Sequence, residues 1–554
     1  MRYWVRLPAV AVCAAWLGAC AGHKTPPPSA DIDETGYRDG VRVLASDDFE
    51  GRRPGTRGEE KTVAYLADRF RKLGLKPGNG DSYFQQVPRV EIEAGSDASL
   101  SIVGHGATRS LAYAKDMVVW SKRTAASAEL RQSDLVFVGY GIVAPEYGWN
   151  DYQGVDVSGK TVLVLVNDPG YATRDPKVFR GSAMTYYGRW TYKVEEAAKQ
   201  GAGGVLLIHD PQAAAYGWDV VVNSWTGPQL QSATADGNAG LPAVEGWVSN
   251  AASRALFAQA GLDFGALTTA AAHPGFKAVA MGLKADARIN NSVRRFNSAN
   301  VVAILPGSGH SKQFVIYTAH WDGLGQDPAR AGNAVFDGAV DNASGASGLV
   351  MLAQSFKRTL PGPDRSVVFL ALTGTQSGLL GSAYYVENPI FPLRDTAGVI
   401  NVDSLHIGGR TRDVSVFGQG NSELEDYLRV GALLQGRVTH GDPNPERGYY
   451  YRSDQFSFAK HGVPALYAQG GPDDSARGPA WGAAQLEDYI ARRYQQPTDK
   501  YSDDWDTGGA VDDLWLYYMV GMRVANTKRF PRWYPDSEFR ASHEPHIGPE
   551  QPSQ

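Results

Sequence analysis

The sequence predicts an α/β fold in which helices flank a mostly parallel β-sheet. Four apolar runs of strand length carry this prediction and lie in the second half of the chain, at residues 301–305, 314–317, 366–372 and 398–402. They are continuous rather than alternating, as expected of strands that are buried on both faces of a parallel sheet. Residues 345–360 and 379–386 are expected to form helices between these strands.

The region before these strands is expected to hold a helix and then a second, smaller domain. Residues 59–70 carry apolar side chains at helical spacing, and a Gly-Leu-Lys-Pro-Gly stop follows them. Between residues 128 and 285, strand-like runs alternate with short helices, at 135–141, 159–166, 194–199 and 201–208. A chain of 554 residues is too long for one simple core. We therefore expect two domains, one inserted into the other, and a loosely ordered polar tail at residues 531–554.

Composition and charge exclude several classes of protein. Hydrophobic residues make up 43% of the chain and charged residues 20%, which excludes collagen, a long coiled coil and wholesale disorder. The 54 Lys and Arg residues are outnumbered by 59 Asp and Glu residues, and no block of basic residues occurs. We therefore expect no nucleic-acid partner.

The cysteine count limits the kind of metal site. The two cysteines, Cys13 and Cys20, both lie in the first twenty residues. A disulfide framework and a cysteine-based zinc site are therefore excluded from the body of the protein. Any metal there must be bound by His, Asp and Glu, and the chain has 11 His residues.

The amino terminus is predicted to export the protein. Residues 1–20 combine Arg2 and Arg6, an apolar run too short for a permanent membrane span, and small residues before Cys20. The ending Leu-Gly-Ala-Cys resembles a bacterial lipobox; the alternative is an ordinary signal peptide with an incidental cysteine. Residues 21–35 are polar and proline-rich, as a tether needs to be. We expect an outer-membrane lipoprotein, periplasmic or surface-facing, that contacts the membrane through its lipid anchor only.

Polar side chains follow the predicted strands where those strands end. His320 and Asp322 follow the second strand, Asp341 lies in the turn before the next helix, and Asp403 follows the fourth strand. In an open α/β sheet, ligands bind beyond the carboxyl ends of the strands. One His and two Asp residues that meet there can hold a divalent cation, with Zn²⁺ as the expected ion. Asp322 is placed to fix the tautomer of the His320 imidazole.

Each of these residues also has a purely structural interpretation. A single His after a strand is often a structural or surface residue, and either Asp341 or Ser344 can cap the helix that follows. The order and spacing of the polar residues, taken together, favour the metal site.

A longer pattern resembles a known peptidase family. It is carried by the segments TAHWD (318–322), GAVDNASG (338–345), FLALTG (369–374), SGLLGSAYYV (377–386), YRSD (451–454) and QPTDKYSDDW (496–505). The pattern resembles the zinc aminopeptidase family twenty-eight of clan MH, exopeptidases related to bacterial leucyl aminopeptidases. The resemblance implies a phosphorylase/hydrolase-like aminopeptidase fold built from residues 36–127 and 286–530. It also implies that residues 128–285 form an inserted, β-rich protease-associated domain, and that peptides or protein N-termini bind in the cleft.

The resemblance implies a two-zinc centre of which one half is intact. In this family five ligands hold two zinc ions. The resemblance places His320, Asp341 and Asp403 at one complete zinc site. The other site should combine Asp341 with a Glu and a late His, but the chain has Gln376 and Gln495 at those two positions.

The substitutions predict a loss of activity. Thr375 stands at the position of the family's general base, and a Thr hydroxyl cannot accept a proton near pH 7 without an activating neighbour. Neutral amides at Gln376 and Gln495 leave the second site with Asp341 alone, which is too little to retain zinc. We therefore expect the chain to hold one zinc ion or none.

Two hypotheses from different classes stay open. The first is a peptide-binding lipoprotein that hydrolyses peptides poorly or not at all. The second is a zinc metallo-aminopeptidase that works with one ion at His320, Asp341 and Asp403, since one metal can still polarise a carbonyl and acidify water. His406 and Asp337 lie close in sequence to the predicted ligands and are kept as candidate substitutes. The losses fall on one half of the centre, which favours the first hypothesis.

Overall fold

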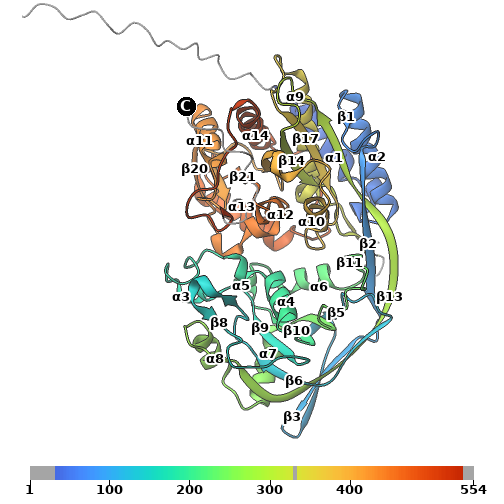
Figure 1. Ribbon diagram of the computed structural model, residues 1–554, viewed down its shortest axis with the longest axis vertical. Helices are drawn as coiled ribbons and strands as arrows, with labels where there is room; N and C mark the ends of the chain where they lie inside the picture. Colours follow the sequence, from blue (N-terminus) through green and yellow to red (C-terminus); the bar gives the residue numbers. More distant parts are fainter. Residues whose placement is uncertain (1–30, 328–333, 541–554) are drawn as a thin grey trace, which may run out of the picture.

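One strand of 27 residues, β13 (Val279–Leu305), runs through both halves of the molecule (Figure 1). The computed structural model describes residues 31–327 and 334–540. We call residues 95–289 the lower region and the other described residues the upper region, after their places in Figure 1. Each region has its own buried hydrophobic cores.

The upper region is built on the mostly parallel sheet that the sequence predicts. Its central strands run parallel in the spatial order β17 (Ser366–Leu372), β14 (Phe314–His320), β18 (Thr396–Asn401) and β21 (Ala465–Gly470). Every residue of β14, β17 and β18 is buried, which explains their continuous apolar sequences. The other strands joined to them in this region are β1 (Lys76–Pro77), β2 (Phe84–Ala94), β19 (Asp413–Phe417) and β20 (Val438–Gly441).

Helices flank this sheet (Figure 1). The predicted helices at 345–360 and 379–386 are α9 (Gly345–Arg358) and α10 (Leu380–Glu387). The predicted first helix is α2 (Arg57–Lys72). The remaining α-helices of the upper region are α1 (Glu34–Leu44), α11 (Leu424–Leu434), α12 (Gln455–Lys460), α13 (Pro479–Arg492) and α14 (Gly508–Asn526).

The lower region is itself an α/β unit. Four of its strands run parallel in the order β6 (Ser127–Phe137), β9 (Thr161–Leu165), β10 (Gly204–Ile208) and β12 (Val244–Val248). The other strands are β3 (Ser99–Gly104), β4 (Ala107–Leu111), β5 (Met117–Trp120), β7 (Val143–Ala144), β8 (Trp149–Asn150), β11 (Gln229–Ser232) and the first part of β13. The helices are α3 (Pro169–Thr173), α4 (Trp190–Lys199), α5 (Pro211–Ala214), α6 (Trp218–Trp225), α7 (Asn250–Gln259) and α8 (Phe264–Ala271).

The lower region begins earlier than the predicted start of the inserted domain. The predicted boundary at residue 128 falls inside β6. Buried side chains from Ala98 onward already pack in a lower core, because β3 and β5 belong to the lower strands. The predicted end at residue 285 falls inside β13, so no loop marks the return to the upper region.

The first ten residues of the predicted tail are packed, against expectation. Trp533 and Phe539 are each 5% exposed and belong to an upper core. Trp533 Nε1–H donates to the carbonyl of Gly462 at 2.9 Å. Aromatic side chains thus dock this segment, whereas residues 541–554 lie outside the described residues.

Among the helices of residues 31–327 and 334–540, none combines the length and the apolar character that a membrane span requires. The predicted lipidation site, Cys20, lies outside the described residues.

Candidate metal centre

Three predicted metal ligands meet at the carboxyl end of the upper sheet. His320 ends β14, Asp403 follows β18, and Asp341 lies in the segment Ala339–Ser344 before α9. One ligand atom of each lies within 4.8 Å of the other two. His320 Nε2 is 3.1 Å from Asp341 Oδ1 and 3.6 Å from Asp403 Oδ1, and all three residues are buried. One imidazole nitrogen and two carboxylates at this spacing fit one zinc ion.

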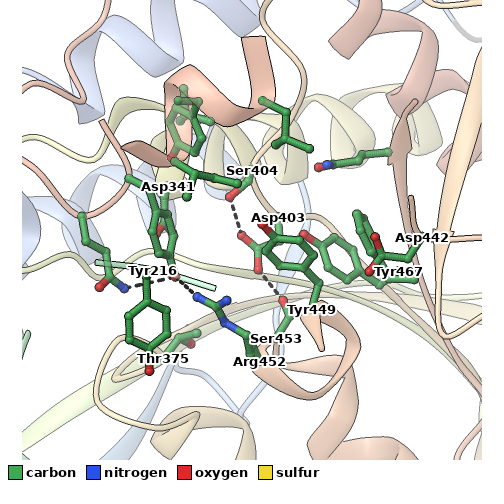
Figure 2. Close-up of a pocket in the computed structure, with 18 of the residues that line it drawn as sticks. Tyr216, Asp341, Thr375, Asp403, Ser404, Asp442, Tyr449, Arg452, Ser453 and Tyr467 are labelled. Carbon is green, nitrogen blue, oxygen red and sulfur yellow. Dashed lines mark hydrogen bonds between the residues drawn. The ribbon is translucent and has the colours of Figure 1, made fainter. Parts of the chain in front are cut away.

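Neighbouring groups fix the orientation of these ligands. His320 Nδ1 lies 3.2 Å from the carbonyl oxygen of Asp322 and 3.4 Å from its Oδ1, so Nε2 faces the other two ligands. The hydroxyl of Ser404 donates to Asp403 Oδ1 at 3.1 Å, and the hydroxyl of Ser453 donates to Asp403 Oδ2 (Figure 2). Such contacts set the geometry and the basicity of metal ligands.

Asp341 does not cap α9. The cap is supplied by Asn342, whose Oδ1 accepts the N–H of Gly345 at 3.0 Å, and Ser344 makes no side-chain capping bond. Asn342 Nδ2 also donates to the carbonyl of His320 at 3.2 Å, which ties the end of β14 to this segment. The carboxylate of Asp341 therefore faces the cleft instead of the helix.

Gln376 and Gln495 lie together beside Asp341, and they are joined by hydrogen bonds. Gln376 Nε2 is 3.1 Å from both Asp341 Oδ1 and Asp341 Oδ2. Gln495 Nε2–H donates to Gln376 Oε1 at 2.8 Å. The hydroxyl of Ser224, on α6, donates to Gln495 Oε1 at 2.7 Å. A row of neutral hydrogen-bonding groups thus runs from Asp341 across the cleft to the lower region.

Thr375 contacts a buried carboxylate that the sequence reasoning missed. Its hydroxyl donates to Asp454 Oδ2 at 2.8 Å, and the hydroxyl of Ser382 donates to Asp454 Oδ1 at 2.6 Å. Burial raises the pKa of Asp454 to about 6, although the charge of His320 and these two hydrogen bonds oppose it. The backbone N–H of Thr375 donates to Asp322 Oδ1 at 3.1 Å, so the same Asp holds the His320 side and the Thr375 side of the centre.

The charges of the centre are coupled. Burial lowers the pKa of the His320 imidazole, but its contacts with Asp322, Asp341 and Asp403 outweigh burial and raise the pKa well above its ordinary value. Burial raises the pKa of Asp403, whereas the hydrogen bond and charge of His320 pull it below its ordinary value. The cluster therefore attracts a positive charge, either a proton on His320 or a metal cation in its place.

The centre opens into a cavity of about 570 Å³ that is lined by both regions. The upper region contributes the ligands themselves together with Thr375, Gln376 and Gln495. Figure 2 shows Asp341, Asp403 and Thr375 among the lining residues. The lower region contributes a largely aromatic wall of Tyr186, Trp190, Tyr216 and Trp225. A concave, mostly apolar site with a few polar groups at one end suits a small molecule or a short peptide.

The two candidate substitute ligands do not join the centre. His406 lines the same cavity but is not part of the ligand group, and burial lowers its pKa. Asp337 is paired with Lys500 through its Oδ2. Within residues 31–327 and 334–540, the group of His320, Asp341 and Asp403 is the only set of three such side chains close enough to share a metal.

Further residues that support the centre lie in segments that carry the family resemblance. Ser453 and Asp454 belong to YRSD, and Asp499 belongs to QPTD. The Asp499 carboxylate accepts the N–H of Val340 at 3.2 Å and the N–H of Asp341 at 3.1 Å, which fixes the backbone of that ligand. The segments were recognisable, but the contacts of these residues depend on tertiary structure.

The family model of Peptidase family M28 matches residues 300–519. The chain carries a peptidase family M28 domain. This domain contains every predicted site residue except Cys20. It includes β14, α9, β17 and β18, the elements that position the centre.

Two relatives are similar to parts of this chain. The chain is 30% identical over 252 residues to the "Probable zinc metalloprotease" of Pyrenophora tritici-repentis (strain Pt-1C-BFP), a match that covers 43% of this chain and 56% of that protein. It is 29% identical over 127 residues to "Aminopeptidase NAALADL1" of Rattus norvegicus, covering 22% of this chain and 16% of that protein. The chain thus spans about half, or less, of the length of these curated relatives.

A solved structure shares the fold of both regions. The aminopeptidase from Aneurinibacillus sp. strain AM-1 superposes with a TM-score of 0.51 at 20% sequence identity. The match covers 89% of this chain and 94% of that one. The predicted α/β fold is therefore confirmed.

Proposed function

We propose that this protein binds peptides or protein N-termini in a peptidase family M28 cleft that holds a single zinc ion, at His320, Asp341 and Asp403. Hydrolysis is absent or strongly reduced compared with a two-zinc peptidase. The proposal is supported by one compact ligand group beside a cavity of peptide size.

The observation that carries the proposal is the row of amides beside Asp341. Gln376 directs its amide nitrogen at both oxygens of Asp341, and Gln495 in turn donates to Gln376. An N–H group satisfies a carboxylate in the way that a cation does, but without a full charge. A second zinc ion would have Asp341 as its one anionic ligand and would have to displace this row of hydrogen bonds.

The intact half of the centre fits zinc. His320 offers Nε2, because Asp322 holds its Nδ1, and two carboxylates complete three ligands, as in catalytic zinc sites that keep an open position. When bound there, the ion polarises a peptide carbonyl and lowers the pKa of water. With Thr375 in place of a general base, a rate lower by about 10²–10⁴ is expected.

The contact between Thr375 and Asp454 favours a second candidate function, a slow one-metal aminopeptidase. The Thr375 hydroxyl donates its proton to Asp454, so its oxygen can accept a proton from water while Asp454 takes the hydroxyl proton. A carboxylate with a pKa of about 6 suits this relay near neutral pH. Under this alternative, Asp454→Asn abolishes turnover of aminoacyl-anilides and leaves peptide binding in place.

The test combines metal content with activity. Elemental analysis of purified protein dialysed against dilute zinc should give at most one zinc ion per chain. Calorimetry should detect binding of short peptides, whereas a panel of aminoacyl-anilides and dipeptides should show little or no turnover. Two zinc ions per chain together with robust turnover would contradict the proposal.

Export and lipid anchoring at Cys20 belong to the same proposal. They are supported by the charged, apolar and small-residue order of residues 1–20 and by the polar stretch after them. Expressed in a bacterium with labelled palmitate, the full chain should incorporate the label and sediment with membranes. Cys20→Ser should release it into the soluble fraction, whereas an unlabelled wild-type chain would identify an ordinary signal peptide.

A further inference from the structure

Two arginines from different regions line the cavity beside the metal centre. Arg189 immediately precedes α4 in the lower region, and Arg452 ends the short helix Tyr449–Arg452 in the upper region. The next residue after Arg452 is Ser453, whose hydroxyl donates to Asp403 (Figure 2). The cavity wall that carries Arg452 therefore adjoins the metal ligands directly.

Aromatic rings, and not carboxylates, surround the Arg452 guanidinium. Arg452 lies over the rings of Tyr216, Tyr449 and Tyr494 at 5.7, 5.3 and 5.4 Å from their centroids. It donates to the Tyr494 hydroxyl at 2.5 Å. Rings of this kind hold a guanidinium in place without cancelling its charge.

Neither arginine has an acidic partner in the part of the chain that the structure describes. Arg189 Nε is buried and has no hydrogen-bond partner there. The third arginine that lines the cavity, Arg493, is paired with Asp499. Arg189 and Arg452 differ from Arg493 in this respect, although buried charged side chains are ordinarily paired.

The two cations also act on each other. Burial, followed by the positive charge of Arg452, lowers the pKa of Arg189 to about 10. Burial raises the pKa of the Tyr216 hydroxyl and both arginines lower it, and all three residues line the same cavity. Two like charges that meet in a confined cavity repel, and an anion placed between them relieves the repulsion.

We propose that Arg189 and Arg452 form a subsite that binds a carboxylate of the peptide in the cavity, so that the protein selects acidic peptides or short peptides with a free carboxyl terminus. The inference rests on the proposed function, because it assigns a chemical class to the peptide of that same cleft. Carboxylates pair with guanidinium groups through two parallel hydrogen bonds, which gives direction as well as affinity. Because one arginine comes from each region, the bound carboxylate would bridge the cleft.

The test compares three probes by calorimetry on the zinc-loaded full chain. The probes are alanyl-alanine amide, which has no carboxylate, glutamyl-alanine amide, which has one on a side chain, and alanyl-alanine with a free carboxyl terminus. At least one carboxylate probe should bind about 10- to 100-fold more tightly than the amide without a carboxylate. The tighter of the two identifies the source of the carboxylate.

Variants then locate the subsite. Arg189→Gln and Arg452→Gln should each bring the affinity for the preferred probe down toward that of the neutral amide, with little change for the neutral amide itself. Arg131→Gln is the matched control, because Arg131 is 83% exposed, lies in the lower region and pairs with Glu129 at the surface. The Arg189 side chain donates no hydrogen bond within the described residues, so Arg189→Gln still tests the subsite if Arg452→Gln fails to fold.

The outcomes separate the two proposals. Equal binding of all three probes by the wild-type chain would overturn the carboxylate subsite and leave the proposed function standing. A carboxylate preference that survives both Arg→Gln changes would also overturn the subsite. Failure of every probe to bind would overturn the proposed function, and the subsite with it.

Discussion

The two halves of the metal centre share Asp341 and lie side by side, yet they are built from opposite chemistry. One half offers an imidazole and two carboxylates, and the other offers two carboxamides and a hydroxyl. The two halves are nevertheless held by the same residue. Asp322 contacts His320 on one side and accepts the backbone N–H groups of Thr375 and Gln376 on the other. Under the proposed function, this scaffold keeps the shape of a two-metal centre without the charges that would fill half of it.

The largest expected effect comes from giving the second half the same kinds of ligand as the first. The triple variant Thr375→Glu, Gln376→Glu and Gln495→His supplies a base, an anion and an imidazole at positions that already face one another. It should hold two zinc ions per chain and hydrolyse aminoacyl-anilides at least about 10²-fold faster than the wild-type chain. Elemental analysis and initial rates measure both effects.

Gln376→Glu alone is the control for added charge, and it should recover much less activity. A triple variant that still holds one zinc ion would show that Gln376 and Gln495 do not mark the second half.

Removing the imidazole of the intact half should have the next largest effect. His320→Gln leaves two carboxylates without a nitrogen ligand, so bound zinc should fall from one ion per chain to none. His310→Gln is the matched control, because the His310 side chain is 61% exposed and pairs with Asp364 at the surface. Zinc retained by His320→Gln would place the metal elsewhere.

Removing the charge of Asp322, which contacts both halves, should have a smaller effect. Asp322→Asn keeps an oxygen acceptor but removes the negative charge beside His320 Nδ1. Zinc affinity, measured by competition with a chromophoric chelator, should fall about 10- to 100-fold. Asp134→Asn, an exposed residue paired with Lys284, provides the control. Unchanged affinity would mean that Asp322 serves the backbone turn alone.

The smallest expected effect is on the free energy of unfolding and comes from Thr375, in the half of the centre that contains the two amides. The Thr375 hydroxyl stabilises the ionised form of Asp454, so Thr375→Val should cost about 1.5–3 kcal/mol of unfolding free energy at pH 8. The folded pKa of Asp454 is about 6, above that of an unfolded Asp, so the folded state takes up its proton first as the pH falls. The cost of the variant should therefore shrink at pH 5, where Asp454 is protonated.

Urea unfolding at the two pH values measures this difference. Thr269→Val, at an exposed position of α8, should show no such pH dependence. An equal loss at pH 5 and pH 8 would show that the hydroxyl does not interact with a titrating carboxylate.

The sequence allowed the fold and the ligand positions to be predicted for a physical reason. Strands such as β14 and β17 are buried on both faces, so their apolar runs are continuous, and the polar residues that follow them mark the edge where ligands bind. The end of the lower region was less predictable. β13 crosses it without a loop, so no change of composition marks the place.

Some site residues had no signal in the sequence at all. Arg189 stands before an ordinary helix, and its place in the wall of the same cavity as Arg452 arises only in the tertiary structure. The docking of Trp533 and Phe539 likewise depends on an upper core that forms from distant residues. Long-range contacts of this kind cannot be inferred from periodicity or from short motifs.

The strand β13 joins the upper and lower regions by continuous strand pairing instead of by a flexible loop. Its residues Asn291–Val301 pair with Ala94–Phe84 of β2, and its earlier residues pair with β6, so a hydrogen-bonded ribbon joins the two regions (Figure 1). A change in the angle between the upper and lower regions therefore has to bend this paired ribbon, whereas a loop would allow free rotation at a hinge.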